Sequence, residues 1–225
     1  MQLQCSVCGS TSFTANKVLW PQLIEDWQLS PEEVAYIDEQ QGTCCDLCGA
    51  NVRSIALAIA IRSLMGTQLP LKDVTLKGFS ILEINEAGML SPVLESCGER
   101  TFGAYPDVDM LALPHEDSVF DMVVHSDTLE HIKNPTLALS ECYRVLKPGG
   151  GLCFTVPTII GRMTRCRDGL PNSYHGTSES AENDLIVHTE FGADAWTYII
   201  QAGFTELSIH TFSYPAGIAY LARKP

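Results

Sequence analysis

Two short motifs near the start of the chain carry residue types that bind metals. Each is a pair of cysteines separated by two residues and followed by glycine: Cys5-Ser-Val-Cys8-Gly9 and Cys45-Asp-Leu-Cys48-Gly49. This spacing lets a tight turn offer two thiolates to one tetrahedral Zn²⁺, and glycine tolerates the left-handed backbone of such a turn. We expect Cys5, Cys8, Cys45 and Cys48 to form one four-thiolate zinc site. Cys44 remains an alternative to Cys45, and reduced structural thiols without metal are the alternative for the whole set.

The overall charge limits what the protein binds. The chain has 225 residues, with 27 acidic against 14 basic side chains and a net charge of −13. A nucleic-acid interface needs clustered Lys and Arg, and docking on an anionic membrane needs them as well. We therefore expect neither nucleic acid nor membrane as a partner. The longest apolar stretch, Ile55 to Ile61, is far shorter than the ~20 residues of a membrane-spanning helix. No basic, apolar leader opens the sequence, so a cytoplasmic location without disulfides is expected.

The elements that must position the cysteines lie in residues 1–52. Ser30-Pro31-Glu32-Glu33 predicts a helix start, with a capping serine, a proline in the first turn and acids near the positive end of the helix dipole. An apolar helical face is formed by Trp20, Leu23, Ile24 and Trp27, which we interpret as the core of a small zinc-knuckle module. Residues 53–78 are predicted to be a linking helix, from Arg53 to Met65, and a connection.

From Phe79 the chain alternates predicted strands and helices. The predicted strands are Phe79–Ile84, Arg100–Tyr105, Phe120–His125, Gly151–Val156, Phe204–Phe212 and Gly217–Arg223. The predicted helices are Pro135–Leu146 and Asp194–Gln201. This alternation favours an α/β sheet covered on both faces, in which ligands bind beyond the carboxyl ends of the strands.

Four segments give the second part its family resemblance. They are Asp109-Met-Leu-Ala-Leu-Pro114, Ser118-Val-Phe-Asp-Met-Val-Val124, Leu129-Glu-His131 and Arg144-Val-Leu-Lys-Pro-Gly-Gly150. In this order they resemble the class I S-adenosylmethionine-dependent methyltransferases, in particular the type 11 group. The resemblance covers about residues 79–225 and implies a Rossmann-like sheet of seven strands with the last one antiparallel. The N-terminal zinc-binding module would then be an addition to a methyltransferase domain.

The resemblance also implies which residues bind S-adenosylmethionine. Glu83 matches the acid that ends the first strand, and Asn85 and Ala87 stand where the family has glycines, leaving Gly88. Tyr105 is a candidate to stack on the adenine, with Asp107 as a loose candidate for the ribose. The remaining expected contacts are Asp109 and Leu111 for the adenine, and Ser126 and Asp127 beside the methyl group. For Asp109 and Asp127, capping of a turn or helix is the structural alternative.

Methyl transfer to a hydroxyl group needs a base, and histidine is the commonest choice. We expect His131 or His175 to be catalytic, with His188 as a further candidate. His175 and His188 lie in the long segment between Thr158 and Phe191, whose arginines Arg162, Arg165 and Arg167 either hold an anionic substrate group or are solvated.

The predicted function is therefore methyl transfer from S-adenosylmethionine to a small molecule, such as a sugar or a lipid-linked precursor. The replaced glycines at Asn85 and Ala87 keep a second hypothesis open, an inactive methyltransferase-like scaffold whose zinc module binds a partner. A dinucleotide-binding oxidoreductase is disfavoured, because the Gly-x-Gly-x-x-Gly motif is absent.

Overall fold

The N-terminal region is a small two-stranded sheet with helices inserted between its strands. The computed structural model describes residues 3–173 and 185–225. The elements of this region are β1 (Phe13–Ala15), α1 (Pro21–Asp26), α2 (Pro31–Gly42) and β2 (Thr43–Cys45). The predicted start of α2 is confirmed: the Ser30 hydroxyl accepts from the Glu33 backbone N–H while the Glu33 carboxylate accepts from the Ser30 N–H. This reciprocal pair satisfies two N–H groups that a helix start otherwise leaves without partners.

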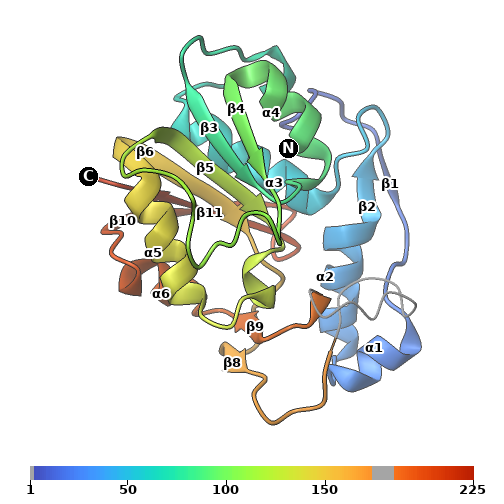
Figure 1. Ribbon diagram of the computed structural model, residues 1–225. Helices are drawn as coiled ribbons and strands as arrows, with labels where there is room; N and C mark the ends of the chain where they lie inside the picture. The colour runs from blue at the N-terminus through green and yellow to red at the C-terminus, as the bar shows by residue number, and fades with distance from the viewer. Residues whose placement is uncertain (1–2, 174–184) are drawn as a thin grey trace.

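A six-stranded sheet forms the centre of the molecule (Figure 1). Its strand order is β10-β11-β6-β5-β3-β4. The strands are β3 (Ser80–Ile84), β4 (Glu99–Gly103), β5 (Phe120–Ser126), β6 (Leu146–Thr155), β10 (Glu206–Phe212) and β11 (Gly217–Arg223). β4, β3, β5 and β6 run parallel, and β11 is antiparallel to both β6 and β10. The predicted α/β class and the antiparallel last strand are thus confirmed.

The expected number of seven strands differs from what the described residues contain. Residues 104–119, between β4 and β5, form turns and no strand, so β4 is the edge of the sheet. Several turn-forming residues, among them Pro106, Asp107, Asp109 and Pro114, occur in this stretch and disfavour a continuous ladder.

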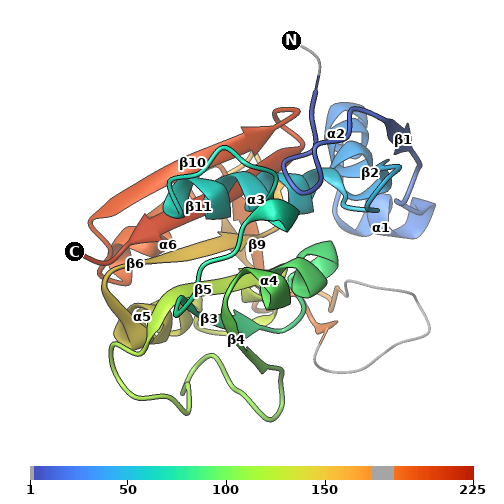
Figure 2. The same ribbon diagram turned by 90° about the horizontal axis from the view of Figure 1, so that it is seen from above.

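Helices cover both faces of the sheet. α3 (Val52–Leu64) lies against β11, β10 and β6, while α5 (Pro135–Val145) and α6 (Trp196–Gln201) pack together on the opposite face (Figure 2). Side chains alternate along the strands: Met122 and Val124 belong to the core under α3, and Val123 to the core under α5. The contact of α3 with the sheet is close, since a Cβ on Gly151 would lie 2.6 Å from Leu64 Cδ1.

The remaining elements connect these layers. They are η1 (Leu71–Asp73), η2 (Gly88–Leu90), α4 (Ser91–Cys97), η3 (Leu129–His131), and the small sheet of β7 (Thr158–Ile159), β9 (Thr189–Gly192) and β8 (Arg165–Cys166). Within residues 3–173 and 185–225, no helix is both long enough and apolar enough to span a membrane.

Candidate functional site

The predicted metal ligands come together at one point. The sulfur atoms of Cys5, Cys8, Cys45 and Cys48 all lie within 4.8 Å of one another. Cys5 Sγ is 3.7 Å from Cys48 Sγ, and Cys8 Sγ is 3.5 Å from Cys45 Sγ. Sulfurs bound at 2.3 Å to a tetrahedral zinc would be about 3.8 Å apart, so the donor set fits this ion.

The two glycines that close the motifs adopt the expected conformation. Gly9 has φ +84° and Gly49 has φ +71°, and each donates its N–H to the carbonyl of the first cysteine of its motif, at 2.8 Å. Cys45 belongs to the cluster and Cys44 does not, because adjacent residues of β2 point to opposite sides. Burial acts to raise the pKa of the Cys45 thiol, but the N–H groups of Cys48 and Leu47 outweigh it and lower this pKa to about 7.

A cleft of about 550 Å³ lies at the carboxyl ends of β3, β4 and β5. Eight of the residues predicted for cofactor binding or catalysis are in its lining, namely Asn85, Tyr105, Asp109, Leu111, Ser126, Asp127, His131 and His188. Carboxyl ends of parallel strands are the usual place for ligands in open α/β sheets. Glu83 and Gly88 are not among the lining residues.

The loop after β3 has a defined shape despite its replaced glycines. Asn85 adopts φ +54°, the left-handed region that Asn tolerates better than most residues. Its Oδ1 accepts from the Tyr105 N–H at 3.1 Å, which ties this loop to the end of β4. Ala87 has φ −76°, so this position needs no glycine. Gly88 has φ +58°, and a Cβ there would lie 3.2 Å from Ser54 Oγ.

Glu83 supports this loop from below. Its side chain is fully buried, and Oε1 accepts from the Ala87 N–H at 2.8 Å and from the Ser91 hydroxyl. The other carboxylate oxygen pairs with Arg100. Glu83 therefore holds the loop in position without itself lining the cleft.

Asp109 and Ser126 also make local contacts. Asp109 Oδ1 accepts from the Leu111 N–H at 2.8 Å, the turn cap that was the structural alternative for this residue. The Ser126 hydroxyl lies 2.8 Å from Thr155 Oγ1, between the ends of β5 and β6. Both residues keep their positions on the wall of the cleft.

A residue that the sequence analysis did not single out, Arg53, forms an ion pair with Asp127. Asp127 has φ +47° directly after β5, and its Oδ2 also accepts from Gln41 Nε2 at 3.3 Å. Burial lowers the pKa of Arg53 to about 10, although the Glu130 carboxylate opposes the shift. The available signal was an arginine in the first turn of a mostly apolar helix, because such a charge needs a partner when it is buried.

The histidine candidates have different surroundings. His131 Nδ1 lies 3.0 Å from the Ile186 carbonyl oxygen, and its Nε2 lies 3.6 Å from Glu130 Oε1. His188 lines the same cleft, and burial, followed by the charge of Lys133, lowers its pKa. His175 lies outside the described residues.

A second cavity of about 430 Å³ adjoins the first. The two share Asp127, His131 and Leu185. Its other lining residues come mainly from the N-terminal region and from the start of β7: Val18, Leu19, Trp20, Leu23, Trp27, Ile37, Gln40, Gln41, Arg53, Pro157, Thr158 and Ile159. Leu23 and Trp27 belong to the buried core, as interpreted, and also line this wall, whereas Trp20 is 37% exposed.

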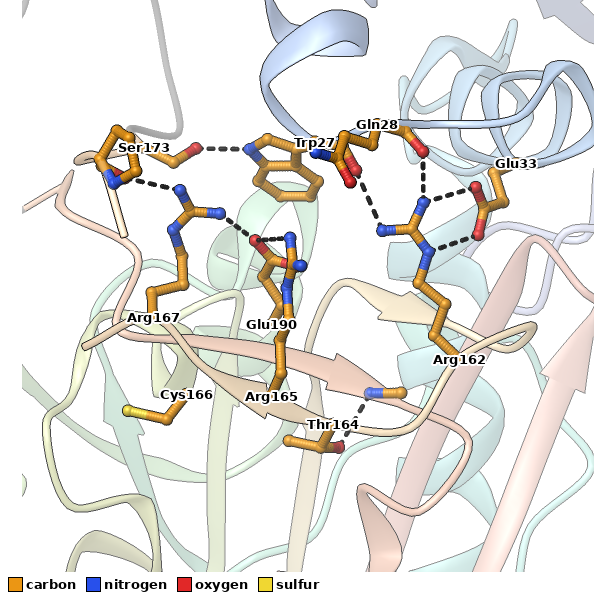
Figure 3. Close-up of polar contacts among 12 residues, drawn as sticks. Trp27, Gln28, Glu33, Arg162, Thr164, Arg165, Cys166, Arg167, Ser173 and Glu190 are labelled. Carbon is orange, nitrogen blue, oxygen red and sulfur yellow. Dashed lines mark hydrogen bonds and ion pairs between the residues drawn. The ribbon is translucent and has the colours of Figure 1, made fainter. Parts of the chain in front are cut away.

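Three arginines that were candidates for an anionic substrate group are engaged by protein groups instead (Figure 3). Arg162 forms two 2.8 Å bonds to the Glu33 carboxylate and donates to the carbonyls of Trp27 and Gln28. Arg165 and Arg167 both pair with Glu190. The Trp27 indole N–H donates to the Ser173 hydroxyl. The contacts of Arg162 and Ser173 hold α1 and α2 against the segment after β7.

The sheet order and the cleft define the class, a Rossmann-like methyltransferase fold carrying an N-terminal four-cysteine cluster. Comparison with known families agrees. Residues 84–154 match the family model Methyltransf_11, described as "Methyltransferase domain". The chain therefore contains a methyltransferase domain of this kind.

Individual proteins show the same likeness. The chain is similar to the ubiquinone biosynthesis O-methyltransferase of Pseudomonas putida, with 27% identity over 129 residues, 57% of this chain and 51% of that protein. It is 36% identical over 76 residues, 32% of this chain and 29% of that protein, to a probable S-adenosylmethionine-dependent methyltransferase of Mycolicibacterium smegmatis. The chain spans about half the length of the Pseudomonas putida relatives it matches.

Solved structures give a weaker likeness. A Thermotoga maritima structure described as a S-adenosylmethionine-dependent methyltransferase, possible histamine N-methyltransferase, is 15% identical, with a TM-score of 0.45. The match covers 77% of this chain and 90% of that chain.

Proposed function

We propose that the protein transfers a methyl group from S-adenosylmethionine to an oxygen atom of a small molecule. The observation that carries this proposal is the cleft beyond β3, β4 and β5, which the sequence-predicted residues line. The printed name of the Pseudomonas putida relative, an O-methyltransferase, supports oxygen as the acceptor atom. The cytoplasmic location expected from the sequence is part of the proposal.

Several residues would hold the cofactor. The loop from Asn85 to Gly88 would receive the methionine portion, since its backbone is shaped by Glu83 and by two left-handed residues. Asp109, Leu111 and Tyr105 would line the adenosine portion, and Ser126 and Asp127 would lie near the sulfur. Bound S-adenosylmethionine would supply the methyl group: its bond to sulfur would break, with the electron pair staying on sulfur, as the acceptor oxygen bonds to the methyl carbon.

The protein's own contribution is alignment and removal of a proton. A carbonyl oxygen only accepts hydrogen bonds, so the contact with Ile186 places the hydrogen of neutral His131 on Nδ1. Nε2 then holds the lone pair and is our candidate to accept the acceptor's proton. The Glu130 carboxylate at 3.6 Å would stabilise the imidazolium that results.

The cysteine cluster has a separate role in this proposal. We infer that it binds one zinc ion, supported by the four convergent sulfurs and by their close spacing. Four thiolates leave no open coordination position, so the ion stabilises the fold and takes no part in methyl transfer.

Isothermal titration with S-adenosylhomocysteine tests the cofactor site. We expect one binding site per chain in the zinc-loaded protein, and substantially weaker binding in Asp109→Ala. A folded, zinc-loaded protein that gives no heat at millimolar S-adenosylhomocysteine would contradict the proposal and favour the inactive scaffold.

A further inference from the structure

We propose that the second cavity, between the cysteine-containing region and the sheet, binds the methyl acceptor, and that this acceptor is an uncharged, largely apolar molecule carrying a hydroxyl group. This inference rests on the proposed function, because it assigns the acceptor of the same reaction. It also gives the N-terminal region a direct part in substrate binding.

Continuity with the cofactor cleft is the first argument. Asp127 and His131 line both cavities. A molecule in the second cavity would therefore meet the cofactor cleft where Asp127 follows β5, the place assigned to the reacting methyl group. The two cavities also have the sizes expected of small-molecule sites, about 430 and 550 Å³.

The lining of the cavity indicates the chemistry of its occupant. Most of its residues are aliphatic or aromatic, and Trp20, Leu23 and Ile37 of the N-terminal region are among them. Its fully charged side chains, Arg53 and Asp127, form an ion pair with each other. A charged acceptor would lose its hydration on this wall without gaining a free partner, so the site favours a neutral body.

Polar groups are concentrated at the end shared with the cofactor cleft. Gln41 donates to Asp127 Oδ2 at 3.3 Å, and His131 lies on the same shared wall. An acceptor that places its apolar part on Trp20 and Leu23 would direct its hydroxyl group toward this end. Apolar enclosure with a few convergent polar groups is the usual composition of a small-molecule site.

The N-terminal wall is held in place by contacts with the segment after β7. Arg162 joins Glu33 and the carbonyls after α1, and the Trp27 indole N–H bonds to Ser173 (Figure 3). Trp27 is only 5% exposed, whereas Trp20 is 37% exposed. The cavity therefore has one fixed aromatic wall and a more accessible aromatic side chain beside it.

Binding of 4-hexylphenol, measured by titration calorimetry at pH 7, tests the inference. This probe is neutral at that pH and combines an apolar chain with a hydroxyl group. We expect one site per chain, with or without S-adenosylhomocysteine, and at least about tenfold weaker binding of the anionic analogue 4-hexylbenzoate. Val18→Asp and Trp20→Ala should each weaken the phenol about tenfold, while their affinity for S-adenosylhomocysteine stays unchanged. Trp196→Ala is the matched control, because Trp196 is 42% exposed and is not among the lining residues.

Three results would overturn the inference while leaving the cofactor site intact: binding of S-adenosylhomocysteine without binding of 4-hexylphenol, competition between the two ligands, or equal binding of the benzoate. If both lining variants bind the phenol like the unaltered protein, the assigned wall is wrong. A protein that binds the phenol and not S-adenosylhomocysteine would contradict the proposed function, and the assignment of an acceptor site would fall with it.

Discussion

The two adjoining cavities are built in different ways. The cofactor cleft is lined mainly by residues that follow the neighbouring parallel strands β3, β4 and β5, so strand order brings most of them together. The second cavity is lined by residues from α1, α2 and the start of β7, which are remote in the sequence. The first thus depends on the sheet, and the second on the docking of the N-terminal region. Changes to that region should therefore affect the second cavity more than the first.

Removal of the metal should have the largest effect on the N-terminal region that forms the second cavity. In Cys8→Ser or Cys48→Ser we expect the zinc content to fall from about one per chain toward zero and the N-terminal region to unfold. Structural zinc sites contribute on the order of 10 kcal/mol to folding. Elemental analysis, circular dichroism and 4-hexylphenol titration would measure this, and Cys44→Ser, a neighbour outside the cluster, is the control. An equally stable metal-free protein would refute the zinc site.

Loss of the Arg162 contacts should have the next largest effect. Arg162→Gln leaves the mostly buried Glu33 carboxylate without its ion pair, which we expect to cost about 2–4 kcal/mol of unfolding free energy. Affinity for 4-hexylphenol should fall while affinity for S-adenosylhomocysteine is retained. Arg165→Gln is the control, since the Arg165 side chain is 40% exposed and the Glu190 carboxylate keeps its ion pair with Arg167. If Arg162→Gln lowers the affinities for 4-hexylphenol and S-adenosylhomocysteine equally, the docking contacts affect both cavities and the distinction between them is wrong.

Variants of Asn85 test the cofactor cleft, the cavity that depends on the sheet. At φ +54°, alanine is strained and has no polar side chain to form the local hydrogen bonds that help asparagine adopt this conformation. Asn85→Ala also removes the contact with the Tyr105 N–H, so we expect about tenfold weaker binding of S-adenosylhomocysteine. Asn85→Gly fits this φ and should remain within about threefold. Calorimetry of both variants checks this, and 4-hexylphenol affinity should not change. Gain of affinity in Asn85→Gly from an unmeasurable starting level would instead support the inactive scaffold.

The smallest expected effect is the part of the pH dependence of unfolding free energy that comes from Glu33. Burial acts to raise the pKa of Glu33, but hydrogen bonds from Arg162 and Ser30 outweigh it, and the pKa is lowered from its ordinary value of 4.5. The carboxylate therefore contributes stability above about pH 4.5, which is lost as the pH falls through the folded-state pKa. We expect unfolding free energy to fall more between pH 6 and pH 3 in the unaltered protein than in Glu33→Gln. Glu32→Gln, an exposed neighbour, should behave like the unaltered protein.

The sequence predicted the features that depend on local spacing. The glycine-closed cysteine pairs predicted the sulfur cluster, and apolar runs such as Phe120–His125 predicted the strands. Because carboxyl ends of parallel strands share one edge, residues such as Asn85 and Ser126 were expected near one cleft, and the structure places them there. Their roles in cofactor binding remain predictions.

Features that depend on contacts between distant segments were not predictable in this way. Arg162 and Arg165 were candidates for substrate binding because nothing in the sequence indicates that Glu33 and Glu190 would pair with them. Arg53 was not recognised, since its partner Asp127 is on a different element. The support that the buried Glu83 carboxylate gives to the loop was not predicted either, and its role in cofactor binding remains a prediction.

The close packing of α3 on the sheet has a consequence for how the protein can be divided. This helix begins with the N-cap Asn51, three residues after the last cysteine of the cluster, and its residues Val52 and Leu64 lie against Gly217 and Gly151 of β11 and β6. A fragment that starts at residue 79 would expose the apolar side chains of the β6–β11 face that α3 covers. Such a fragment should be expressed mainly as insoluble material. α3 therefore has to be kept with the sheet whenever the cysteine-containing region and the methyltransferase domain are separated or exchanged.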